Sequence, residues 1–113
     1  METNPDSRQT EFEAQVAALC RRFLDGLPAR QAALADAWRN CADAGDETPW
    51  QRLREVAHNL SGSAPCYGLE AMGQAARNLD LLLSDHPPCR ARAVASVPVA
   101  RLQSALDAAI EAG

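Results

Sequence analysis

The sequence predicts an all-α protein, an up-down four-helix bundle whose N-terminal helix is kinked or split. Alanine, the strongest helix former, supplies roughly a fifth of the 113 residues, whereas aromatic residues make up only 4%. Apolar residues recur at spacings of three and four along four segments, which is the period of amphipathic helices. Clusters that contain proline or glycine separate these segments by short links, as in an up-down bundle.

The first helical segment begins near Phe12 and carries an apolar face to about residue 41. Gly26 and Pro28 interrupt it, so the pattern predicts either one long helix kinked at Pro28 or two helices with Pro28 in the first turn of the second. Gly45 is the predicted C′ residue that ends the segment. The apolar face consists of Phe12, Val16, Leu19, Phe23, Leu27, Leu34, Trp38 and Cys41.

Three further helices follow. The second is predicted to have Thr48 as its N-cap and Pro49 at its first helical position, and to stop at Pro65. The third ends before residues 86–88, and a loop rich in Pro and Arg leads to the last helix, which is predicted to start at residues 96–98. Their inward-facing residues are predicted to be Leu53, Val56, Ala57, Leu60 and Ala64, then Leu69, Met72, Ala76, Leu79 and Leu83, then Leu102, Leu106 and Ile110.

Length and charge narrow the possible functions. We expect residues 1–9 to form a flexible arm and residues 10–113 to form a single domain. The net charge of −4 and the scarcity of aromatic residues argue against a nucleic-acid partner. No apolar run is long enough to span a membrane, and the polar start is unlike a signal peptide, so we expect a cytoplasmic protein.

The cysteines do not predict a metal centre. The four cysteines lie more than twenty residues apart and form no CxxC pair, and His86 with Cys89 lacks two further ligands at compatible spacing. We therefore expect reduced thiols, with Cys20 and Cys41 on apolar helical faces, and no metal or cofactor bound by the protein itself.

One histidine is predicted to face outward from the bundle. At 100° per residue, with Leu53 at 0°, His58 falls near 140°, almost opposite the apolar stripe of its helix. Gly62 lies one turn later on the same face, where a helical glycine costs roughly 1 kcal/mol relative to alanine. Ser61 and Ser63 flank this glycine with hydroxyls that can bond a phosphoryl oxygen. These features suggest a functional histidine with open space for a partner. The alternative is that Gly62 is a tolerated weak point near the end of a helix that Pro65 soon stops.

The string from His58 to Ala64, followed by Gly68 and Leu69, resembles the signature of the histidine-containing phosphotransfer (HPt) family. That signature reads His-x-Leu-Lys-Gly-Ser-[Ala/Ser], then a small gap, a glycine and an apolar residue. The chain matches it at His58, Leu60, Gly62, Ser63, Ala64 and Gly68.

The resemblance implies a phosphoryl carrier in a multistep two-component phosphorelay. His58 would accept the phosphoryl group from an aspartyl phosphate on a receiver domain of a hybrid sensor kinase and pass it to the receiver aspartate of a response regulator. Mg²⁺ would be bound by the receiver and not by this chain. Asp80 aligns with a position where the family often places a polar residue beside the histidine, and its carboxylate would accept the Nδ1 proton and leave Nε2 free to attack. The alternative is an exposed carboxylate that pairs with Arg77 or with water.

One departure from the signature concerns charge. Ser61 stands where the family has a lysine, which removes a cation from the phosphoryl group, and Arg54, one turn before His58, is a candidate replacement. The docking surface for a receiver is predicted around Glu55, Asn59, Gly62 and Arg77. Tyr67 and Leu69 would add apolar area unless they belong to the core.

Two other classes of function remain open. A scaffold or adaptor would bind receivers independently of phosphorylation. An autonomous kinase or hydrolase is less consistent with the sequence, because it contains no Gly-rich phosphate loop, metal triad or nucleophile–histidine pairing. A monomer is the expected state of a freely diffusing carrier.

Overall fold

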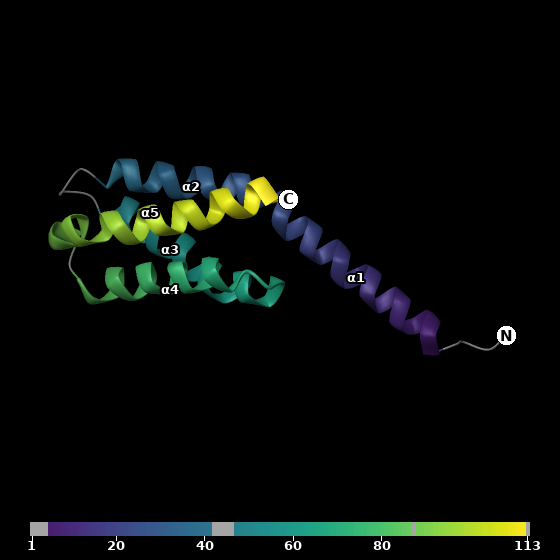
Figure 1. Ribbon diagram of the computed structural model, residues 1–113. Helices are drawn as coiled ribbons and strands as arrows, with labels where there is room; N and C mark the ends of the chain where they lie inside the picture. Colours follow the sequence, from purple (N-terminus) through teal and green to yellow (C-terminus); the bar gives the residue numbers. More distant parts are fainter. Residues whose placement is uncertain (1–4, 42–46, 87, 113) are drawn as a thin grey trace.

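A computed structural model describes residues 5–41, 47–86 and 88–112. The elements are α1 (Pro5–Asp25), α2 (Leu27–Asn40), α3 (Thr48–Ser63), the 3₁₀ helix η1 (Ala64–Tyr67), α4 (Glu70–Asp85) and α5 (Pro88–Ala112). Figure 1 shows α2 to α5 running alternately up and down as a bundle, with α1 extending away from it. The all-α four-helix prediction is confirmed, and the described residues contain no strand.

The first helical segment is bent at Gly26, which separates α1 from α2. Helix α1 ends at Asp25, Gly26 adopts φ −83° and ψ −9°, and Pro28 lies in the first turn of α2. The Gly26 amide still donates to the carbonyls of Arg22 and Phe23, at 3.2 and 3.1 Å. The Arg30 amide in turn donates to the Gly26 carbonyl at 3.2 Å, so the helical hydrogen bonds continue through the bend. Pro28 is tolerated here because the first turn of a helix does not need the missing proline amide.

The apolar face of this segment divides at Phe23. Leu27 and Leu34 on α2 and its C-cap residue Cys41 are buried as predicted. Phe23 is buried under Tyr67, with ring centroids 4.4 Å apart. In contrast, Phe12, Val16 and Leu19 are exposed, because α1 projects from the bundle and its N-terminal part does not contact the core (Figure 1). Helix α1 already includes residues 5–9, and the predicted division into a 1–9 arm and a 10–113 domain stays a prediction.

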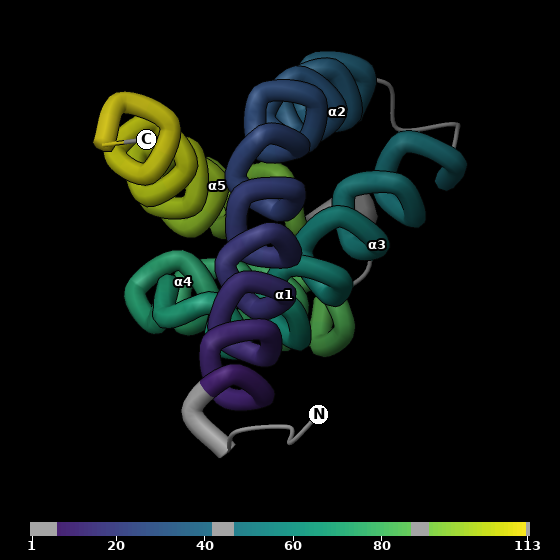
Figure 2. Tube along the Cα trace, turned by 90° about the vertical axis from the view of Figure 1, so that its right-hand side faces the viewer, coloured from purple at the N-terminus to yellow at the C-terminus, as the bar shows by residue number. Residues whose placement is uncertain are grey.

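The bundle core is built from the predicted stripes of α3, α4 and α5. Leu53, Leu60, Leu79, Leu102 and Leu106 are all fully buried. In the end-on view of Figure 2, each of the four helices has two neighbours, and the pairs in contact are α2–α3, α3–α4, α4–α5 and α2–α5. Helices α3 and α4 are consecutive in sequence and are joined only by η1 and two further residues, which places them in close antiparallel contact.

Helix α1 begins at Pro5 and not near Phe12, and two further predicted helix starts are wrong. Helix α3 has Glu47 in the N-cap position, so Thr48 is its first residue and not its cap. Helix α5 begins at Pro88, and Pro98 lies inside it. The stripe Ala91, Ala95, Val99, Leu102 and Leu106 is buried continuously across Pro98, so packing outweighs the cost of about 3 kcal/mol for an interior proline. The predicted C′ residue Gly45 lies outside the described residues.

Candidate functional site

His58 lies on α3 and faces solvent. Its side chain is 73% exposed, whereas its helix neighbours Ala57 and Leu60 are fully buried. The predicted outward direction of the imidazole therefore agrees with the structure. A fully buried histidine would contribute to core packing, whereas the exposed ring of His58 is accessible to another molecule.

Asp80 of α4 lies beside this histidine. The Nδ1 atom of His58 is 3.0 Å from Oδ2 of Asp80, and the Asp80 side chain is only 16% exposed. An ionised carboxylate only accepts hydrogen bonds, so Nδ1 donates its proton in this contact. In the neutral ring Nε2 then carries the free lone pair. Of the two alternatives for Asp80, the structure has the pairing with His58 and not one with Arg77.

Arg54 completes a row of three charged or polar groups. Its Nε lies 3.6 Å from Oδ1 of Asp80, an ion-pair distance that is too long for a hydrogen bond. The Oδ1 atom is buried and has no hydrogen-bond partner among the described residues. The Arg54 side chain is 58% exposed and, together with Gln51, Glu55 and His58, borders an open hollow of about 370 Å³. Arg54 thus pairs with the Asp80 carboxylate and lines the same hollow as His58.

The close approach of α4 to η1, which directly follows α3, depends on Gly73, a residue that the sequence-based prediction of the site did not include. A Cβ atom on Gly73 would lie 2.6 Å from Cγ and 2.8 Å from Cδ of Pro65. Only a residue without a side chain fits there, and Gly73 is itself buried. Because Asp80 is two turns further along α4, this contact helps to set its distance from His58. The signal in the sequence was a glycine within the inward-facing part of a helix.

The residues that follow His58 differ in whether they could contact a partner or a phosphoryl group. A Cβ built on Gly62 meets no atom within 4 Å, so nothing in the protein itself excludes a larger residue at this exposed position. The Ser61 and Ser63 hydroxyls donate to the His58 and Asn59 carbonyl oxygens, each at 2.7 Å. These hydroxyl protons are therefore engaged with the helix backbone and do not point freely toward a phosphoryl group.

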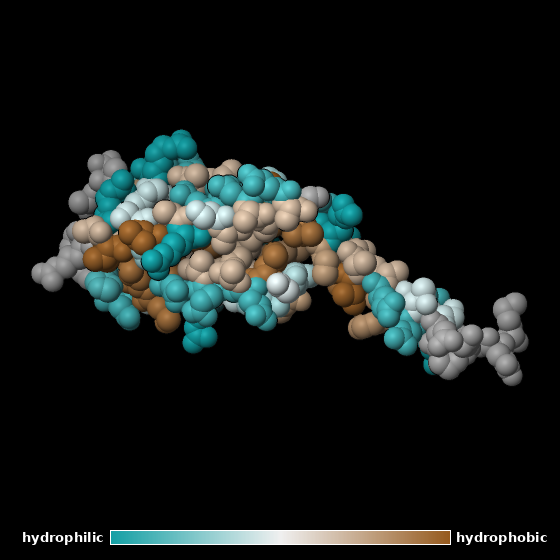
Figure 3. All heavy atoms as spheres, in the orientation of Figure 1, coloured by the Kyte–Doolittle hydropathy of each residue, from teal (hydrophilic) through white to brown (hydrophobic). Residues whose placement is uncertain are grey.

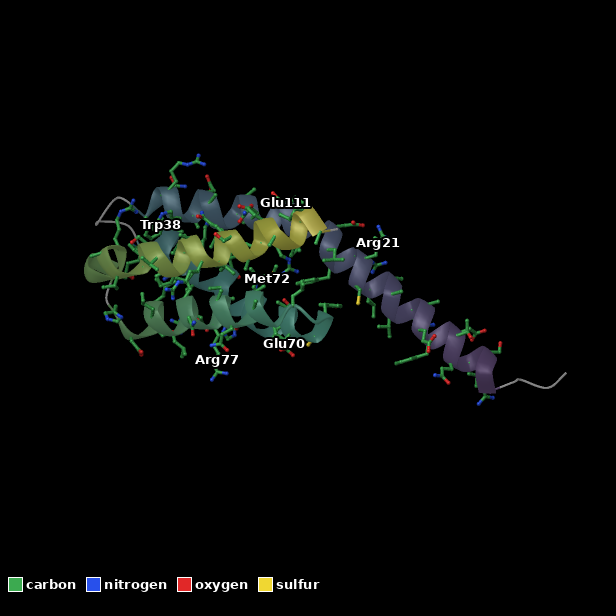
Figure 4. All side chains as sticks on the ribbon, in the orientation of Figure 1. Arg21, Trp38, Glu70, Met72, Arg77 and Glu111 are labelled. Carbon is green, nitrogen blue, oxygen red and sulfur yellow. The ribbon has the colours of Figure 1, made fainter. Side chains whose placement is uncertain are left out.

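The other predicted docking residues are spread around the histidine. Arg77 on α4 is exposed, makes no hydrogen bond or ion pair within the described chain, and points away from the bundle (Figure 4). Glu55 borders the hollow beside His58 and also one of about 300 Å³ between α2 and α3, where Asn59 lies. Tyr67 and Leu69 pack against the core, so the core alternative applies to both.

Two absences concern the described residues only. Within residues 5–41, 47–86 and 88–112, no group of three or more His, Cys, Asp or Glu side chains is arranged to hold a metal ion. Across the same ranges, no helix has the length and apolar character that a membrane span requires.

Comparison with known families gives one match. A family model described as the Hpt domain matches residues 18–112, which include α2 to α5 and the end of α1. No curated protein and no solved structure matches the chain.

Proposed function

Because the chain belongs to the Hpt domain family, whose members are phosphocarrier modules in two-component signalling, we propose that His58 is the residue that carries the phosphoryl group. In this proposal the donor is an aspartyl phosphate on the receiver domain of a hybrid sensor kinase, and the acceptor is the receiver aspartate of a response regulator. One observation carries the proposal: an exposed imidazole whose Nδ1 lies 3.0 Å from a carboxylate oxygen.

The hydrogen bond to Asp80 supports attack by Nε2. The Nε2 lone pair forms a bond to phosphorus, and the donor aspartate leaves with the electron pair of the broken P–O bond as a carboxylate. The ring that results keeps the Nδ1 proton and bears a positive charge, which the adjacent Asp80 carboxylate stabilises. Transfer to the second receiver is the reverse of this reaction, with the acceptor carboxylate as the attacking group.

The partner supplies the remaining chemistry. Transfer of a phosphoryl group spreads negative charge over its oxygens, and we propose that Mg²⁺ held by the receiver neutralises most of it. On this chain, Arg54 is the cation that borders the same hollow as His58. Because the Ser61 hydroxyl bonds the backbone, Arg54 is a better candidate than Ser61 for contact with the phosphoryl oxygens.

The surface around His58 is the proposed docking face for the receiver. Gly62 has no side chain, so a receiver can approach closely one turn from the imidazole. Polar and charged groups surround this face, namely Glu55, Asn59 and Arg77. Charge at the rim of such an interface affects association rate and partner choice more than affinity.

The cytoplasmic location of the protein stays a prediction.

The test uses the full chain and a phosphorylated receiver domain. The label should move to the wild-type protein and to a His86→Gln variant, but not to His58→Gln. His86 is a suitable control because it is the second histidine of the chain, is also exposed, and lies on the neighbouring helix end, where its Nδ1 is 2.9 Å from the Leu82 carbonyl oxygen. The label on His58 should survive base and be lost in acid, which distinguishes phosphohistidine from aspartyl phosphate.

A phosphorylation-independent scaffold is the alternative outcome. Its signature is a receiver that binds wild type and His58→Ala equally well, with no label transferred to either. ATP alone should leave the protein unlabelled. Labelling by ATP would contradict the assignment of a carrier without kinase activity.

A further inference from the structure

Helix α1 presents an apolar face that no described part of the chain covers. Phe12, Val16 and Leu19 are 66%, 42% and 51% exposed, and Figure 3 shows hydrophobic atoms along the projecting helix. Amphipathic helices gain most of their stability by packing this face. A row of three large apolar side chains on a helix that leaves its own bundle is therefore the kind of surface that another molecule covers.

The spacing along this face is that of a coiled coil. Phe12, Val16, Leu19 and Phe23 follow one another at intervals of four, three and four, which assigns them to positions d, a, d and a of a heptad. Phe23 is already covered within the bundle by Tyr67 and by the Arg30 guanidinium, 4.9 Å from the ring centroid. The family match starts at residue 18, so Phe12 and Val16 lie outside the part of the chain that it describes.

The charges beside this face fit a second, parallel copy of the same helix. The heptad assignment places Arg8 at g and Glu13 at e. In a parallel pair, a g residue meets the e residue five positions later on the partner helix, which brings Arg8 beside the Glu13 of the other copy. Two-fold symmetry forms this opposite-charge pair twice. An antiparallel pair would instead place g residues against g residues, namely Arg8, Gln15 and Arg22, with no opposite charge among them.

We propose that a second copy of this chain covers the face, and that two α1 helices pair in parallel through Phe12, Val16 and Leu19. This dimer replaces the expectation of a monomer. It goes beyond the phosphotransfer role and does not depend on it, because His58 lies on α3 and the face lies on α1. The dimer would present two copies of the His58 surface from one pair of helices.

The first test compares two matched leucines by sedimentation equilibrium of the full chain. Leu19 on α1 and Leu81 on α4 are 51% and 50% exposed. The wild type should dimerise in a concentration-dependent manner. Leu19→Glu should raise the dimer Kd by at least about tenfold, equivalent to about 1.4 kcal/mol, whereas Leu81→Glu should leave it unchanged. A wild type that is monomeric at every concentration, or equal effects of the two variants, overturns the proposal.

A charge exchange tests the parallel arrangement. Arg8→Glu and Glu13→Arg should each weaken the dimer, because each places like charges opposite one another, and the double variant should restore it. A double variant weaker than both single variants overturns the parallel register. If Leu19→Glu instead lowers the melting temperature of a monomeric protein, the face packs against its own bundle and the proposed dimer is wrong. Phosphotransfer to His58, measured on the same samples, reports separately on the proposed function.

Discussion

The Nδ1 of His58 and the Oδ2 of Asp80 lie 3.0 Å apart across the contact between α3 and α4. The relationship joins a largely exposed ring to a largely buried carboxylate, with 73% and 16% of the two side chains exposed. A buried acceptor holds its partner more firmly than an exposed one, because water competes less for the hydrogen bond. The ring is thereby fixed in one orientation while its Nε2 edge stays accessible.

Removal of this acceptor should slow phosphotransfer. Asp80→Ala takes away both the hydrogen bond and the charge that stabilises the ring during transfer, and hydrogen bonds to charged groups contribute about 1.5–3 kcal/mol. The rate of transfer from a phosphorylated receiver should fall roughly tenfold to a hundredfold. Asp80→Asn keeps an oxygen acceptor, so its transfer rate should lie between those of wild type and Asp80→Ala. Equal rates for wild type and Asp80→Ala would show that the contact does not orient the ring for reaction.

Replacement of Gly62 by alanine should separate stability from function. No atom lies within 4 Å of the added Cβ, so the variant should gain up to about 1 kcal/mol in the free energy of unfolding. Receiver binding or transfer should weaken nevertheless, and more so in Gly62→Leu, because the added atoms occupy the space next to His58. Urea unfolding and transfer rates measured on the same variants test this. Unchanged transfer in Gly62→Leu would mean that the receiver does not approach this position.

The same substitution at Gly73 should have the opposite effect on stability. The added Cβ would lie 2.6 Å from Cγ of Pro65, inside the contact between η1 and α4. Overpacking of this kind costs about 1–3 kcal/mol, which should outweigh the gain in helix propensity. Urea unfolding should therefore show Gly73→Ala to be less stable than wild type and Gly62→Ala to be more stable. A stabilised Gly73→Ala protein would contradict the close packing described here.

Cys41 should make stability depend on alkaline pH. Burial raises the pKa of its thiol from 9.0 to about 11, against a smaller opposing effect of the Arg92 charge. Between these two values the thiol ionises in the unfolded chain but keeps its proton in the folded protein. The free energy of unfolding should therefore fall as pH rises from 9 to 11. Cys41→Ala should show a smaller fall in urea titrations over this range, and Cys66→Ala, at an exposed site, should match wild type.

Periodicity was sufficient to predict the bundle and the direction of His58. The 100° rule separates the buried Leu53 and Leu60 from the exposed His58 on one helix, because burial of apolar area decides which side of a helix faces inward. The position of Asp80 beside His58 could not be predicted from its own helix alone. It was expected from the resemblance to the HPt family, in which a polar residue often lies at the aligned position, and in the structure it depends on the packing of Gly73 against Pro65.

Other features depend on tertiary packing that a local pattern does not contain. Pro98 reads locally as a helix start, yet the buried stripe from Ala91 to Leu106 keeps α5 continuous through it. Phe12 and Leu19 read as core residues, but α1 extends beyond the bundle that would bury them (Figure 1). In each case the residue pattern predicts correctly which side of the helix is apolar. The packing of the helices against one another determines whether that side is buried.

The short connection between α3 and α4 has a consequence for how the site forms. His58 and Asp80 belong to one helical hairpin closed by η1, so their contact joins segments that are near in sequence. Closure of a short loop costs little chain entropy, and helical proteins rich in such local contacts fold fastest. The contact between His58 and Asp80 therefore forms together with the α3–α4 hairpin. It does not require contacts between segments that are distant in the sequence.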